Sequence, residues 1–182
     1  DSAIIYVRDI RTGEKQLRLA GKRPKTDLNN LDRLVFSPDG SLIAGAYRYV
    51  GTNSEALKVW DAKTGQVLFK FKAPTQSLIP RPVFSPDSSR VMMALSRTVR
   101  AWDARTGNNS HEMSTYPSRT VYAEYFPDGR RIVSGGDDGK IRIFNALVGE
   151  ELLSIDAGKT TFVTVNHDGT RLLSAAEKRS SY

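Results

Sequence analysis

The sequence predicts an all-β fold in which four-stranded antiparallel sheets repeat along the chain. The first observation is a step of 42 residues between the pairs Trp60-Asp61 and Trp102-Asp103, which the pair Phe144-Asn145 continues. The second is a turn phrase that recurs in step with these pairs. The third is the lack of a helix-period stretch between the predicted strands. Self-similarity at a period near forty residues indicates a stacked repeat architecture, so we expect one repetitive array.

The Trp-Asp pair belongs to a longer phrase that ends in a glycine. The phrase reads VWDAKTG at 59–65, AWDARTG at 101–107 and IFNALVG at 143–149, with a degenerate copy, VRDIRTG, at 7–13. An alternating strand enters each copy, as at 140–144, and another strand leaves it, as at 66–71. The phrase is therefore predicted to be the turn between two strands.

A second phrase marks another turn in each repeat. It reads FSPDG at 36–40, FSPDS at 84–88, YFPDG at 125–129 and VNHDG at 165–169. Proline presets φ, the Asp side chain can bond the backbone ahead of it, and glycine accepts positive φ. A short apolar strand follows each copy, so the phrase predicts a tight hairpin.

Together these turns predict four strands per repeat, joined by short loops. Four-stranded antiparallel sheets at this spacing are typical of propeller blades. In chain order we expect a half blade at 3–20, blades at 27–73, 78–115 and 119–156, and a half blade at 160–176. The whole of 1–182 is then a single β-propeller array of about four blades, one of them split between the two ends.

At these residues the chain resembles the WD-repeat (WD40) β-propeller family. The resemblance implies structural roles for Trp60, Trp102, Asp61 and Asp103. The Gly-His pair that usually opens the repeat is absent, so the hydrogen-bonded tetrad of the family (His, Ser or Thr, Asp, Trp) is expected to be incomplete in every copy. Its nearest remnant is Ser134 with Asp138, next to a Phe144 that has no indole donor.

The two half blades leave the closure of the ring open. The first supplies only the third and fourth strands of a blade, and the second supplies only the first and second strands. Three arrangements are expected: half of a longer ring, a homodimer whose two copies close an eight-bladed ring, or a four-bladed miniature. Open blade edges leave unpaired backbone groups, which disfavours a solitary half ring.

Composition fits a folded array without a membrane span. The chain has 182 residues, 39% hydrophobic and 26% charged, no apolar run of spanning length and no cysteine. We expect no cofactor, no metal, no membrane partner and a cytoplasmic location. The formal net charge of +7 is spread along the chain, which favours a solvated surface over a nucleic-acid site.

The resemblance implies a partner-binding surface on the narrower face of the ring. The position three residues before each turn anchor (Phe36, Phe84, Tyr125 and Val165) is expected to point toward the channel mouth. The predicted partner-binding residues at this position are Arg33, Arg81, Tyr122 and Phe162. Arg119 and Lys159, which lie six residues before their anchors, and Tyr49, which lies in a long loop, complete the predicted set. Arginine and aromatic residues at one register are typical of interaction hot spots. The alternative is that Tyr122 and Phe162 pack against neighbouring blades.

Catalysis has little support in the sequence. The only histidines, His111 and His167, have no partner at metal-ligand spacing, and no nucleophile elbow is present. We therefore expect a non-catalytic scaffold that binds a protein or peptide, with an acidic segment as one option for that partner, rather than an enzyme. Three alternatives stay open: a hydrolase-like propeller enzyme with its site at the channel mouth, nucleic-acid binding through a basic face, and an engineered or excised repeat fragment that only self-assembles.

Overall fold

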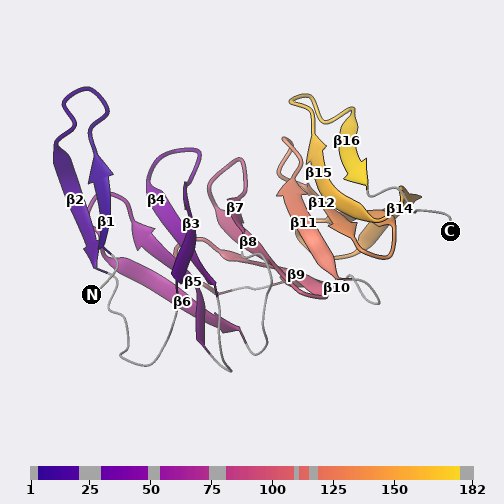
Figure 1. Cartoon of the computed structure of the whole chain (residues 1–182), viewed down its shortest axis with the longest axis horizontal. Helices are drawn as coiled ribbons and strands as arrows, with labels where there is room; N and C mark the ends of the chain where they lie inside the picture. Colours follow the sequence, from indigo (N-terminus) through magenta and orange to yellow (C-terminus); the bar gives the residue numbers. More distant parts are fainter. Residues whose placement is uncertain are drawn as a thin grey trace, which may run out of the picture.

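The computed structural model consists of antiparallel sheets that follow one another in chain order. It describes residues 4–20, 30–48, 54–73, 81–108, 111–114 and 119–176. Every regular element in these residues is a strand, and they contain no helix that could cross a membrane. The sheets line up from the first strand pair to the last, which lie at opposite ends of the array (Figure 1). The all-β prediction is confirmed.

Three of the sheets are complete four-stranded blades. The first holds β3 (Asn30–Phe36), β4 (Leu42–Arg48), β5 (Ser54–Asp61) and β6 (Val67–Ala73). The second holds β7 (Pro82–Phe84), β8 (Arg90–Leu95), β9 (Thr98–Asp103) and β10 (His111–Ser114). The third holds β11 (Thr120–Tyr125), β12 (Arg131–Gly136), β13 (Lys140–Asn145) and β14 (Glu151–Asp156). In each blade consecutive strands are hydrogen-bonded neighbours, as the turn phrases predict.

Two-stranded sheets lie at the ends of the array. One holds β1 (Ile4–Arg8) and β2 (Lys15–Ala20), and the other holds β15 (Thr160–Val165) and β16 (Leu172–Ala176). Among the described strands these two sheets do not pair with each other, so the structure is an open array rather than the closed four-bladed miniature considered above. Each remains a half blade.

The recurring turn phrases form the predicted hairpins. The Gly40 N–H donates to the Ser37 carbonyl at 2.9 Å, and the Ser88 N–H donates to Ser85 in the same way. Gly40 has a φ of +71°, whereas Ser88 adopts +61° with a side chain that disfavours it. The Ser88 hydroxyl also accepts a hydrogen bond from the Asp39 N–H at 3.1 Å, which links the turns of two neighbouring blades.

The aspartate of each Trp-Asp pair closes the other turn. Asp61 Oδ1 accepts hydrogen bonds from the N–H of Lys63 at 3.0 Å and of Thr64 at 2.8 Å, and from the Thr64 hydroxyl at 2.9 Å. Asp103 makes the equivalent three bonds in the next blade. Backbone and hydroxyl hydrogen bonds from Thr64 and Thr106 hold the pKa of these two carboxyls below their usual range. Both carboxylates therefore bond the backbone of the turns that follow them.

The aromatic residue of each pair packs against the preceding sheet. Trp60 is fully buried in a cluster with Ile5 and Leu19 of the first strand pair. Trp102 lies in the cluster between the first two blades, with its ring centroid 4.6 Å from that of Phe71. Phe144 repeats this arrangement against the second blade. The core of the protein therefore lies between blades, as expected for stacked sheets that bury their faces only against neighbours.

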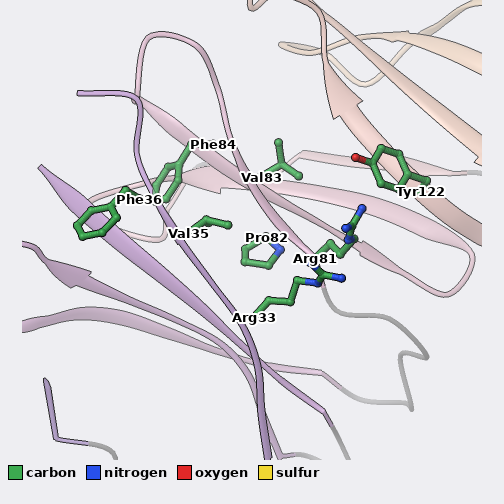
Figure 2. Close-up of a pocket in the computed structure, with 8 residues that line it drawn as sticks. All are labelled: Arg33, Val35, Phe36, Arg81, Pro82, Val83, Phe84 and Tyr122. Carbon is green, nitrogen blue, oxygen red and sulfur yellow. The ribbon is translucent and has the colours of Figure 1, made fainter. Parts of the chain in front are cut away.

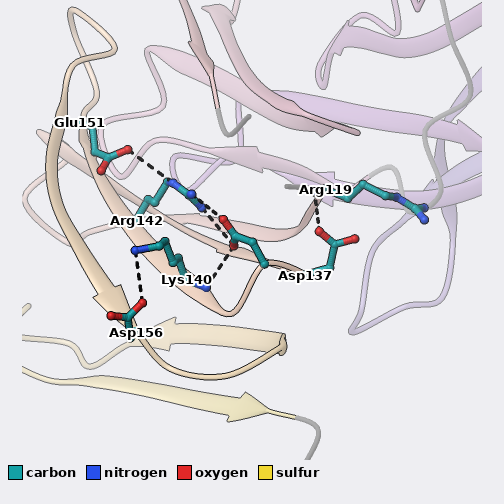
Figure 3. Close-up of polar contacts among 7 residues, drawn as sticks. Arg119, Asp137, Lys140, Arg142, Glu151 and Asp156 are labelled. Carbon is teal, nitrogen blue, oxygen red and sulfur yellow. Dashed lines mark hydrogen bonds and ion pairs between the residues drawn. The ribbon is translucent and has the colours of Figure 1, made fainter. Parts of the chain in front are cut away.

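The tetrad of the family is not completed at the third blade, as expected. The Asp138 carboxylate binds the guanidinium of Arg142 through both oxygens, and Glu151 Oε2 lies 3.5 Å from Arg142 Nε (Figure 3). The Arg142 side chain is only 8% exposed. In the first blade the indole nitrogen of Trp60 is buried with no hydrogen-bond partner among the residues that the structure describes. An ion pair with a buried guanidinium thus stands near the position where the family has its hydrogen-bonded tetrad.

Candidate functional site

A groove lies between the first strands of the first two blades. Its volume is about 310 Å³. The lining residues come from β3, from the start of the second blade and from β11, and they are Arg33, Val35, Phe36, Arg81, Pro82, Val83, Phe84 and Tyr122 (Figure 2). Three of the predicted partner-binding residues (Arg33, Arg81 and Tyr122) therefore line one concave site.

A row of side chains in contact extends from this groove to the third blade and the last strand pair. The Arg81 guanidinium carbon lies 5.0 Å from the centroid of the Tyr122 ring. That centroid lies 4.8 Å from the centroid of Phe162, with the two rings tilted by 52°. We call Arg33, Arg81, Tyr122 and Phe162 the stripe. Its members hold the same position relative to the turn anchors in four successive repeats.

Strand irregularities orient three of the four stripe residues. The pairing of β3 with β4 shifts register between Leu31 and Arg33. Equivalent shifts precede Tyr122 in β11 and Phe162 in β15. A β-bulge inserts one unpaired residue and redirects the side chain that follows it. Such bulges recur next to binding sites, and here each of them lies directly before a stripe residue.

The stripe residues differ in how far they are covered. Arg33 is exposed and Arg81 is half-buried. Tyr122 packs against the cluster formed by Val133, Ile141 and Val163, whereas Phe162 is 37% exposed. Tyr122 packs against a cluster of the neighbouring sheets and also lines the groove.

The cationic members of the stripe have no acidic partner among the residues that the structure describes. Neither Arg33 nor Arg81 forms an ion pair there, in contrast to Arg131 with Asp128 and Arg142 with Asp138. Both guanidinium groups turn toward the same end of the groove (Figure 2). The site thus combines two unneutralised positive charges with an apolar floor and exposed rings.

The remaining predicted site residues lie away from this groove. The Arg119 N–H donates to Asp137 Oδ1 at 2.7 Å, and its side chain extends away from that carboxylate (Figure 3). Lys159 is exposed in the turn before β15. Tyr49 falls outside the described residues. The groove therefore contains three of the residues that lie three positions before the turn anchors. Arg119 and Lys159, which lie six positions before their anchors, do not line it.

Phe36 lines the groove although the sequence did not single it out. The equivalent anchors Phe84 and Tyr125 are buried at 7% and 5% exposure, whereas Phe36 is 56% exposed. Phe36 pairs with Ile43, which is buried against Ile5 and Leu19 of the first strand pair, whereas Phe36 itself stays exposed. The sequence does hold one indication that Phe36 is exposed. Phe36 lies in the first complete blade, and the half blade before it was predicted to have only its third and fourth strands.

The recurring aspartates of the Pro-Asp turns serve the turns. Asp39 Oδ1 accepts from the Ser37 hydroxyl at 2.6 Å and from the Ser41 N–H at 3.0 Å. Asp87 repeats this pattern with Ser85 and Ser89. Hydrogen bonds, chiefly from the Ser37 and Ser85 hydroxyls, lower the pKa of both carboxyls. Across the described segments no group of three His, Cys, Asp or Glu side chains could hold a metal ion.

Comparisons with known proteins agree with this architecture. The family model described as WD domain, G-beta repeat matches residues 113–145. Subunit I of eukaryotic translation initiation factor 3 from Scheffersomyces stipitis is 29% identical over 162 residues, which cover 80% of this chain and 44% of that protein. Autophagy-related protein 16 from Arabidopsis thaliana is 31% identical over 152 residues, which cover 81% of this chain and 28% of that protein. The human WD repeat and SOCS box-containing protein 1 is 28% identical over 116 residues, covering 62% of this chain and 26% of that protein.

These matches and the repeated four-stranded sheets define the class of protein as a WD-repeat β-propeller array. The chain belongs to the WD-repeat family. Proteins of this family are typically non-catalytic scaffolds for protein interactions. The chain spans less than half of the length of the first relatives that it matches, at 44% for two initiation-factor subunits.

Proposed function

We propose that this chain is a non-catalytic scaffold that binds a segment of a protein partner across the stripe. The observation that carries the proposal is that Arg33, Arg81 and Tyr122 line one groove and that Phe162 extends it. Arginine and aromatic side chains at the centre of a concave surface are the residue types that dominate binding energy in protein interfaces.

The size and lining of the groove favour a peptide side chain as its occupant. A volume of about 310 Å³ lies at the small end of ligand sites and fits one or two side chains. Its floor is apolar, formed by Val35, Pro82 and Val83, and its polar groups are confined to the two guanidiniums and the tyrosine hydroxyl. Repeat scaffolds commonly bind extended partners across several repeats on one face.

Selection of short peptides tests this proposal. A phage-displayed library of random peptides is panned on the wild-type chain, and the recovered sequences are measured by fluorescence polarisation. Replacing Arg81 and Tyr122 together by alanine is expected to cost about 2 kcal/mol, which is roughly a thirtyfold loss of affinity. The double variant should remain folded, because neither side chain is fully buried.

A second arginine–tyrosine pair provides the matched control. The Arg8 guanidinium lies over the ring of Tyr6 at 5.7 Å on β1, outside the groove. The Arg8→Ala/Tyr6→Ala variant is expected to keep full affinity. Equal affinities of the two double variants would contradict the proposal that the peptide binds at the stripe.

We also propose that a second copy of the chain covers the open end faces. Leu34 and Phe36 are 41% and 56% exposed near the first end, and Leu153 and Leu173 are 50% and 67% exposed at the last. β1 and β16 each pair with only one described strand, and joining them would produce a four-stranded sheet in the order of the complete blades.

Light scattering over a dilution series tests this pairing of two copies. A dimer that the Leu173→Asp substitution converts to a monomer supports it. A monomer at every concentration contradicts it.

A further inference from the structure

The stripe has two halves of different chemistry. Arg33 and Arg81 form a cationic half beside the first two blades, and Tyr122 and Phe162 form an aromatic half beside the third blade and the last strand pair. The halves are continuous, because Arg81 lies over the ring of Tyr122. A ligand that follows the stripe therefore meets both halves in succession.

The cationic half selects for negative charge. Two guanidinium groups at the same end of one groove repel each other, and no carboxylate of the described residues neutralises either of them. The apolar floor of Val35, Pro82 and Val83 limits solvent screening on one side. A carboxylate placed between the guanidiniums would accept charge-assisted hydrogen bonds, which are about twice as strong as neutral ones.

The aromatic half offers a surface for a ring. Phe162 is 37% exposed and is tilted by 52° against Tyr122, so part of its ring is open to contact a further ring in an offset-stacked or edge-to-face arrangement. Tyr122 is anchored by the cluster around Val163, so this surface is already ordered before a ligand binds. An ordered aromatic surface lowers the entropic cost of binding.

The two halves are close enough for one short segment to contact both. The Arg81 guanidinium lies 5.0 Å from the Tyr122 centroid, which lies 4.8 Å from the Phe162 centroid. Arg81 and Phe162 are therefore at most about 10 Å apart, and an extended chain covers that distance in about three residues.

We propose that the stripe recognises an extended peptide segment in which a carboxylate side chain and an aromatic side chain lie about three residues apart, the carboxylate between Arg33 and Arg81 and the aromatic ring against Phe162. The inference rests on the proposed scaffold function and adds the chemistry of the partner. A double-mutant cycle between the chain and its ligand separates the two claims.

The probes are the tightest peptide from the library, its Glu→Gln or Asp→Asn version, its aromatic→Ala version, and a single-stranded oligonucleotide. Removing the peptide carboxylate is expected to weaken binding to the wild-type chain about tenfold, and less than about twofold once Arg33 and Arg81 are both replaced by glutamine. Removing the peptide ring is expected to weaken binding to the wild-type chain but to have little further effect on the Phe162→Ala variant. The same change should weaken binding to the Arg33→Gln variant as much as it weakens binding to the wild-type chain.

Each outcome decides a specific claim. Peptides that bind at the stripe without an acid and a ring, or that show no coupling, overturn the inference and leave the scaffold function in place. A library that yields no binder overturns both. An oligonucleotide that binds more tightly than any peptide, with arginine-dependent affinity that falls steeply with salt, assigns the cationic half to nucleic acid and also overturns the inference.

Discussion

The ion pair of Asp138 with Arg142 is expected to carry a large share of the stability of the third blade. The Arg142 side chain is 8% exposed, and that of Asp138 is 18% exposed. Asp138 also accepts the Lys140 N–H at 3.1 Å in the turn. Removing one partner of a buried pair leaves an uncompensated charge, which costs about 3–5 kcal/mol. Because Glu151 remains 3.5 Å from Arg142, we expect the lower end of that range, about 3 kcal/mol, for Asp138→Ala.

The neighbouring pair of Lys140 and Asp156 supplies the control. Their side chains are 44% and 89% exposed, and the Lys140 Nζ lies 3.2 Å from Asp156 Oδ1 (Figure 3). Exposed pairs are worth at most about 1 kcal/mol, so Asp156→Ala should barely change stability. Urea denaturation followed by circular dichroism measures both variants, and Asp138→Asn covers the case in which Asp138→Ala does not fold. Equal losses for Asp138 and Asp156 variants would refute the argument from burial.

Three further perturbations test the packing and the turns. A Cβ at Gly45 would lie 2.8 Å from the Trp60 ring, so Gly45→Ala is expected to lower the free energy of unfolding by about 1–3 kcal/mol; an unchanged tryptophan-fluorescence melt would contradict this packing. The Tyr125 hydroxyl is buried and has no hydrogen-bond partner in the described part of the chain, so Tyr125→Phe should leave the melting temperature unchanged or raise it, and a marked decrease would show that the hydroxyl is bonded. The pKa of turn aspartates such as Asp39 and Asp87 is lowered from 3.8, so the stability they contribute is complete above that value and is lost as the pH falls below it. A urea midpoint that stays constant from about pH 6 to pH 2 would contradict that role.

The repeat phrases predicted most of the fold because each one encodes a local turn. Asp61 and Asp103 close their turns through the Thr-Gly residues that follow, and these contacts depend on a few adjacent positions. The register of the stripe could be predicted for the same reason, since Arg33 and Tyr122 stand at a constant distance from their turns. The bulges that orient these two residues leave no pattern in the sequence and were not predicted.

The parts that could not be predicted depend on contacts beyond the turn phrases. In the alternating strand at 140–144, Arg142 looks like a solvent-facing position, but its side chain is 8% exposed and is paired with Asp138. Phe36 holds the same repeat position as the buried residues Phe84 and Tyr125, but it is exposed. The described sheet beside it has only two strands, β1 and β2, which correspond to the third and fourth strands of a blade. Exposure at these positions is set by which strands lie alongside, and no single repeat contains that information.

The affinity of the tightest selected peptide for the Arg81→Ala/Tyr122→Ala variant tests the central claim most directly. Isothermal titration of this variant, of the wild-type chain and of the Arg8→Ala/Tyr6→Ala control gives the three values. We expect a loss of about 2 kcal/mol for the stripe variant alone, with all three proteins unfolding at similar urea concentrations. Wild-type affinity in a folded stripe variant would contradict it.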